Sequence, residues 1–122
     1  MGYRSSVALA ISKELMPRFL TVFAKCPEAQ AMVFKDHDRM DEDYDGEGTF
    51  FVYWDHIKWY TSYPPVEAIE NFLAECELDD FEDLDNSYEH YRFLRLGEDH
   101  DDLDMMGHLC EYDIRLTREL AF

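Results

Sequence analysis

The chain has 122 residues, of which 47% are hydrophobic, and it carries a formal charge of −17 at neutral pH. This length predicts one domain over residues 1–122, able to bury about two thirds of its unfolded surface without a metal or disulfide. The apolar content excludes a disordered acidic tail, and the charge argues against direct binding of nucleic acid or an anionic membrane. A basic partner is favoured instead.

Three cysteines stand far apart in the sequence, at Cys26, Cys76 and Cys110. Their odd number and wide spacing predict buried thiols of a reducing compartment, with no zinc site or redox dithiol. The chain does not begin with the basic and apolar pattern of a signal peptide, and no apolar stretch is as long as a membrane span. A cytoplasmic protein is therefore expected.

The first elements follow clear hydrophobic patterns. Residues 3–11 predict a strand, because Val7, Leu9 and Ile11 alternate with small residues, over which a helix could pack. Ser12 is an expected N-cap, and apolar residues then recur at helical spacing as far as residue 26.

A second short helix is predicted over residues 29–33, restarted by Pro27. Residues 35–48 are acidic and rich in turn formers, which predicts a solvated loop. Residues 49–60, with the sequence TFFVYWDHIKWY, are rich in β-branched and aromatic residues and predict a central strand.

The second half of the chain predicts one helix and two strands. Residues 66–78 have an apolar and an acidic face and predict a helix, followed by an acidic turn over residues 79–87. Residues 88–96 alternate as a strand, residues 97–107 form an acidic loop, and residues 111–120 alternate as a fourth strand.

The predicted fold is therefore α+β, in the order β-α-β-α-β-β. A mostly antiparallel four-stranded sheet with the helices on one face is the simplest way to bury these patterns. The residues expected to be largely buried are Leu15, Phe19, Val22, Trp54, Phe72 and Leu73.

The acidic residues fall into three groups, within residues 36–47, 67–85 and 98–104. One interpretation is a solvated surface that only keeps the protein soluble. The other is a surface that imitates a nucleic-acid backbone, since carboxylates on successive helical turns of about 5.4 Å approach the charge density of DNA. The residues predicted to contact a partner are Glu67, Glu70, Glu77, Asp79, Asp80, Glu82, Asp83, Asp99, Asp101 and Asp102.

The segment from Asp41 to Gly46 matches the first half of an EF-hand calcium loop, with aspartates at alternate positions. The bidentate glutamate that completes such a loop is missing, because Val52 stands at the twelfth position. No metal site is predicted here.

No catalytic motif is present either. Asp55 and His56 are adjacent in a predicted strand and should point to opposite faces, so they cannot form a catalytic pair. If the chain were an enzyme on an unfamiliar scaffold, His56, His90 and Arg92 would be the polar groups to consider.

Three segments, MGYRSSVALAIS, GTFFVYWDHIKWY and HYRFLRLGEDHDD, resemble a family of small, poorly characterised proteins of tailed bacteriophages. That family is expected to share the MGYRS opening, the IKWY strand and the GED turn. The resemblance implies a phage origin and assigns no functional residues. In charge and size alone, the chain is analogous to acidic anti-restriction and anti-CRISPR inhibitors, several of which imitate DNA.

The leading hypothesis is a non-enzymatic phage protein without cofactors that inhibits a host nucleic-acid-binding protein by DNA mimicry in the host cytoplasm. The alternative is an oligomeric interaction protein that pairs through an aromatic sheet face bearing arginines on the last two strands. Those arginines are Arg92, Arg95, Arg115 and Arg118.

Overall fold

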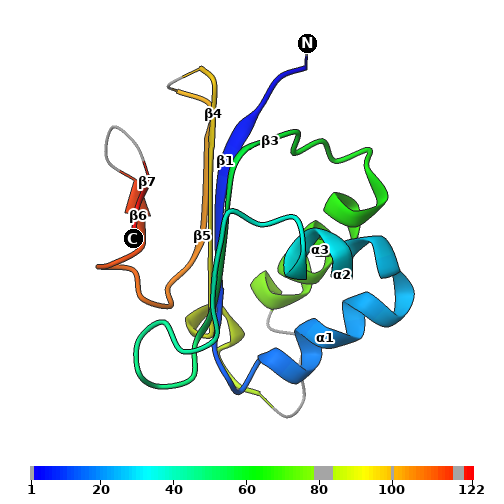
Figure 1. The fold of residues 1–122 in the computed structure, drawn as a ribbon. Helices are drawn as coiled ribbons and strands as arrows, with labels where there is room; N and C mark the ends of the chain where they lie inside the picture. The colour runs from blue at the N-terminus through cyan, green and yellow to red at the C-terminus, as the bar shows by residue number, and fades with distance from the viewer. Residues whose placement is uncertain (1, 79–83, 100, 117–119) are drawn as a thin grey trace.

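The computed structural model describes residues 2–78, 84–99, 101–116 and 120–122. Three α-helices cover one face of a five-stranded antiparallel sheet, and a two-stranded hairpin lies on the other face (Figure 1). This arrangement confirms the predicted α+β class and the antiparallel sheet with its helices on one face. Within these residues, no helix is both long and apolar enough to cross a membrane.

The five strands of the sheet lie in the order β2-β3-β1-β4-β5. Their bounds are β1 Ser5–Ile11, β2 Arg39–Asp41, β3 Phe50–Ile57, β4 Tyr91–Gly97 and β5 Leu103–Gly107. The helices are α1 Met16–Lys25, α2 Pro27–Phe34 and α3 Pro64–Glu77, with a 3-10 turn η1 at Ser87–Glu89. The hairpin pairs β6, Arg115–Leu116, with β7, Leu120–Ala121.

The central strand β1 is buried on both faces. Its residues from Val7 to Ile11 are fully inaccessible to solvent, and β3 and β4 pair with it on either side. Val7, Leu9 and Ile11 point to the helices, whereas Ala8 and Ala10 point to the opposite face. The sheet therefore needs a cover on each side.

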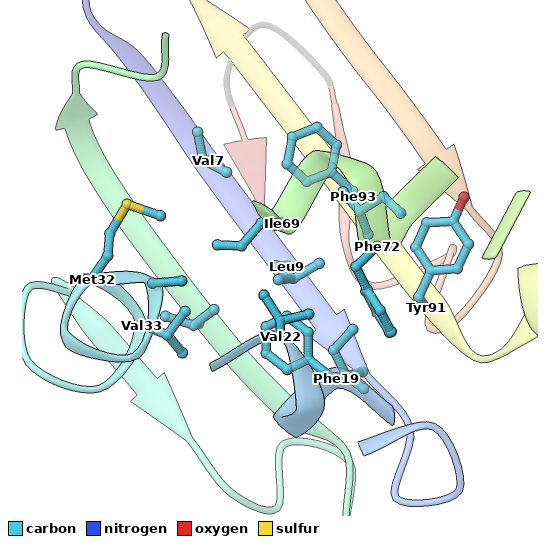
Figure 2. Packing of buried hydrophobic residues seen from close by; sticks show 14 of the residues in the cluster. Val7, Leu9, Phe19, Val22, Met32, Val33, Ile69, Phe72, Tyr91 and Phe93 are labelled. Atoms are coloured by element: carbon cyan, nitrogen blue, oxygen red, sulfur yellow. The ribbon is translucent and has the colours of Figure 1, made fainter. Parts of the chain in front are cut away.

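The helices form the first cover through a core that is rich in aromatic side chains. Figure 2 shows Phe19 of α1 and Ile69 and Phe72 of α3 gathered over Leu9 of β1. The ring of Phe19 lies 5.3 Å from that of Phe72 and 5.2 Å from that of Phe23. All six residues predicted to be buried belong to this core.

The C-terminal segment, described over residues 108–116 and 120–122, covers the other face of the sheet. Ile114 is fully buried against Ala8, Ala10, Phe51 and Leu94. The prediction that a helix packs over the small residues of β1 is therefore wrong. The helices lie on the face with the larger side chains, and the alanines leave room for a segment without helical structure.

Arg92 fastens this cover to the sheet. Its guanidinium is almost fully buried and donates hydrogen bonds to the carbonyls of Ile114, at 3.0 Å, and Gly107, at 2.7 Å. Burial lowers the pKa of Arg92 from its ordinary value. A cation thus binds backbone carbonyls where the sequence suggested an exposed arginine.

The predicted fourth strand over residues 111–120 is wrong. Cys110, with a φ of 53°, reverses the chain, and only the short β6–β7 hairpin follows among the described residues. Residues 117–119 of that predicted strand lie outside the described part. Two segments predicted to be loops contain strands: β2 lies within residues 35–48 and β5 within residues 97–107, so the sheet has five strands.

Ser12 makes the predicted type of capping contact, because its Oγ accepts the N–H of Leu15 at 3.2 Å. The regular part of α1 nevertheless begins only at Met16. A turn therefore connects β1 to the helix.

Two neighbouring residues of α1 test the helix-covered core. Phe19→Ala should lower the free energy of unfolding by about 3–5 kcal/mol, because it opens a cavity among packed rings. Leu20→Ala, at a position 44% exposed, should cost under about 1 kcal/mol. Urea unfolding of both variants measures the two effects, and equal losses would contradict this orientation of α1.

Candidate partner-binding surface

Helix α3 carries the first of the predicted partner-binding residues. Proline at its start and apolar residues at helical spacing bury one side of the helix against the sheet. This orientation leaves Glu67 exposed. Glu67 and Glu75 line a groove of about 380 Å³ between α1 and α3, together with Lys25.

The other two predicted carboxylates of α3 are less available to a partner. Glu77 Oε1 accepts a hydrogen bond from the Tyr91 hydroxyl at 2.6 Å, and burial together with this bond raises the pKa of Tyr91. Glu70 is half-buried, and its Oε1 accepts no hydrogen bond from the described residues. Of these three, Glu67 is the carboxylate best placed to meet a partner.

The turn between β4 and β5 holds the second group. Asp99 and Asp101 are exposed. Asp102 is bound instead, because its Oδ1 lies 2.6 Å from Arg95 Nη2 and its Oδ2 accepts the Tyr3 hydroxyl at 2.7 Å. These two hydrogen bonds, that from Arg95 above all, lower the pKa of Asp102 to about 2. Its charge is balanced within the molecule.

The end of α3 and the β4–β5 turn lie at opposite ends of the sheet. Glu77 binds Tyr91 at the start of β4, and the backbone of Asp102 pairs with Gly97 at its end. Six residue steps along a strand span about 20 Å. Figure 1 shows the end of β4 and the start of β5 at the same end of the sheet as the N-terminus, far from the end of α3. Asp79, Asp80, Glu82 and Asp83 lie outside the described residues.

A further acidic region combines carboxylates of the group at residues 36–47 with Glu14 and Glu89, none of which was predicted to contact a partner. A hollow of about 680 Å³ is lined by residues of the β2–β3 loop, of the turn between β1 and α1, and of η1. We call it the acidic hollow, and the carboxylates lining it are Glu14, Asp43, Asp45, Glu47 and Glu89. Figure 1 shows the β2–β3 loop and the start of α1 at the same end of the sheet as η1. Antiparallel pairing of Ile11 with Phe50 brings the residues after β1 beside those before β3. Pairing of the two predicted strands was therefore the signal that could have found it.

Ser12 and His90 lie within the acidic hollow and join β1 to β4. The Oγ of Ser12 is 2.9 Å from His90 Nδ1, and the backbone N–H of Ser12 donates to the His90 carbonyl. Ser12 is buried, and its Oγ also accepts an N–H at the start of α1. The contact thus fixes the corner between strand and helix.

The three residues considered for an enzyme do not meet. His90 lies at the start of β4, Arg92 is buried under the C-terminal segment, and His56 is exposed near the end of β3. His56 lies at the irregular part of the β1–β3 pairing, and its backbone carbonyl accepts a hydrogen bond from Arg4 Nη1 at 2.9 Å. No catalytic arrangement of these side chains is present.

The aspartates of the half EF-hand bind the chain's own donors. Asp43 Oδ1 accepts the N–H of Gly48 at 2.7 Å, and Asp45 Oδ2 accepts the Thr49 hydroxyl at 2.7 Å. Val52, at the position of the missing glutamate, is fully buried in β3. Within the described ranges, no three His, Cys, Asp or Glu side chains are arranged to hold a metal ion.

The sheet face proposed for oligomerisation is largely occupied by the chain itself. Arg39 lies over three rings, 5.3 Å from the centroids of Phe51 and Phe122 and 5.9 Å from that of Tyr44. Arg92 is buried on this face, whereas Arg95 lies on the helix side and pairs with acids. Arg115 is exposed, and Arg118 lies outside the described residues.

Comparison of the chain with protein-family models, curated proteins and solved structures finds no match.

Asp102 gives a pH prediction. Its pKa falls from an ordinary 3.8 to about 2 on folding, so the carboxylate stabilises the fold above about pH 4, and this contribution disappears as the pH falls towards 2. Asp102→Asn should lower the urea midpoint at neutral pH, and its difference from wild type should shrink between pH 4 and pH 2. Asp101→Asn changes an exposed carboxylate and should have the same urea midpoint as wild type at neutral pH. A difference that stays constant with pH would rule out this role.

The half EF-hand gives a metal prediction. Micromolar calcium should not raise the melting temperature, because buried Val52 supplies no ligand. Calorimetry should show no one-to-one isotherm, with a magnesium titration as the control for weak ionic effects. A tight calcium isotherm that Asp43→Asn abolishes would prove this wrong.

Proposed function

We propose that this chain is a non-enzymatic bacteriophage protein that binds a basic, nucleic-acid-binding host protein and occupies its nucleic-acid site. The supporting observation is exposed charge without internal partners. Glu67, Asp99 and Asp101 are exposed, and none forms an ion pair with another described residue. A desolvated arginine or lysine of a partner would find such carboxylates free to pair.

The spacing of the acids is compatible with imitation of a duplex. Glu77 at the end of α3 and Asp102 after the β4–β5 turn contact opposite ends of β4, about 20 Å apart, which is the rise of about six base pairs. The acidic hollow adds carboxylates at the α3 end. A protein that tracks a phosphate backbone would thus meet negative charge over a comparable length.

The cysteines are compatible with action in the host cytoplasm. All three are free thiols. Burial raises the pKa of Cys76 to about 12 and that of Cys110 to about 11, so neither thiol is activated for chemistry. A reducing compartment and a role without cofactors suit these residues.

If the acids imitate phosphates, binding to the host partner should weaken steeply with salt, and DNA should displace the protein from it. Charge reversal of the acids that follow α3 in the sequence, Asp79→Lys with Asp80→Lys and Asp83→Lys, should slow association most, because charge at the rim of a complex acts mainly on the association rate. Binding kinetics at two salt concentrations, after capture of the partner from host lysate, measure both effects.

The matched control carries the same change in net charge at exposed acids elsewhere, Glu28→Lys with Asp36→Lys and Glu42→Lys. If net charge alone matters, the two triple variants will bind equally weakly. If the acids serve only solubility, neither variant will affect a partner. A complex that survives high salt or resists DNA would refute the mimicry.

A further inference from the structure

The outer edge of β5 has backbone donors and acceptors available for another strand. The N–H of Gly97 donates to the Asp102 carbonyl at 2.8 Å, and bonded pairs alternate along an antiparallel ladder. The N–H and C=O groups of Leu103 and Met105 therefore point away from β4. Among the described strands, none lies beyond β5. Such an edge is a template for strand addition.

The side chains of this edge are apolar on one face. Met105 is 57% exposed and Leu103 is 45% exposed, beside Leu94 and Leu96 of β4. The edge has neither a proline nor a lysine, and its register with β4 is regular. The acid of the strand, Asp104, points to the other face, where Arg95 binds it at 2.7 Å.

We propose that β5 pairs antiparallel with β5 of a second copy of this chain, across a two-fold axis at Met105. In this register Leu103 lies opposite Gly107 of the second copy and Asp104 lies opposite Met106. The carbonyl of Gly107 takes no part in the new ladder, because Arg92 already binds it at 2.7 Å. The outward groups of Met105 then bond to those of Met105 in the other copy, and the two sheets become one.

Charge and strand length select this register. A shift by one residue towards the turn places Asp104 opposite Asp104, and a shift by two places it opposite Asp102, so like charges meet directly. A shift the other way shortens the overlap, because Gly107, with a φ of 78°, turns the chain out of the strand. Of these registers, the pairing centred on Met105 gives the longest overlap in which no acids are opposed.

The dimer should be weak and should strengthen with salt. Five paired residues bury much less than the roughly 800 Å² per partner of a stable complex. Each copy also carries a formal charge of −17, and salt screens the repulsion between them. This salt dependence is opposite in sign to that expected for a complex with a basic partner. The dimer and the proposed function can therefore be tested separately.

Sedimentation equilibrium from micromolar to millimolar protein, at 0.1 M and 1 M NaCl, tests the association. A monomer–dimer equilibrium should appear, with an association constant several-fold larger at the higher salt. Met105→Glu places like charges at the axis and should weaken it more than about tenfold. Leu20→Glu makes the same charge change on α1 and should leave it intact. A monomer under all conditions, or equal effects of the two variants, would overturn the dimer.

Cross-linking tests the register. Opposed bonded residues have Cα atoms about 5.5 Å apart, within the range of a disulfide. Oxidised Met105→Cys should therefore form a covalent dimer, whereas Met106→Cys, two residues out of register with its copy, should not. Wild type controls for Cys26 and Cys110. Cross-linking of both variants or of neither would refute the proposed pairing.

Discussion

The chain has 28 carboxylate side chains and 11 lysines and arginines among its 122 residues, so electrostatic repulsion works against folding. The structure meets this constraint by placing acids at turns, at the two ends of the sheet and on the outer side of α3. Some acids of the described residues are bound locally: Arg95 binds Asp102 and Asp104, and backbone N–H groups bind Asp43 and Asp45. The stability must therefore come from apolar burial.

That burial is extensive for a small chain because the sheet is covered twice. The helices cover Val7, Leu9 and Ile11, and the C-terminal segment covers Ala8 and Ala10 on the opposite face. Arg92 holds the second cover through backbone carbonyls, a use of an arginine that requires no carboxylate partner. The fold is thus built with little help from ion pairs, which leaves much of the acidic surface free for other contacts.

The sequence predicted the elements with strong patterns, such as β1, β3 and α3, and the helix-covered core. The prediction failed where a strand lies among acidic residues and where an alternating pattern does not form a strand. The acids around β5 suggested a loop, although Leu103 and Met105 follow strand alternation. The first residues of the segment 111–120 form a turn instead of a strand, because the carbonyl of Cys110 accepts the N–H groups of Asp113 and Ile114. For the candidate surface, spacing predicted that Glu67 faces outward. It could not reveal the contacts of Glu77 and Asp102, because Tyr91 and Arg95 reach them through tertiary packing.

The central claim is that the carboxylates repel one another more than they hold the fold together. The dependence of stability on salt tests it most directly, through urea unfolding of the wild-type chain at 0.1 M and 1 M NaCl. Over this range the screening length falls from about 10 Å to about 3 Å. The account predicts that the urea midpoint rises with salt. A midpoint that falls would mean that the acids are held in stabilising ion pairs, and would contradict it.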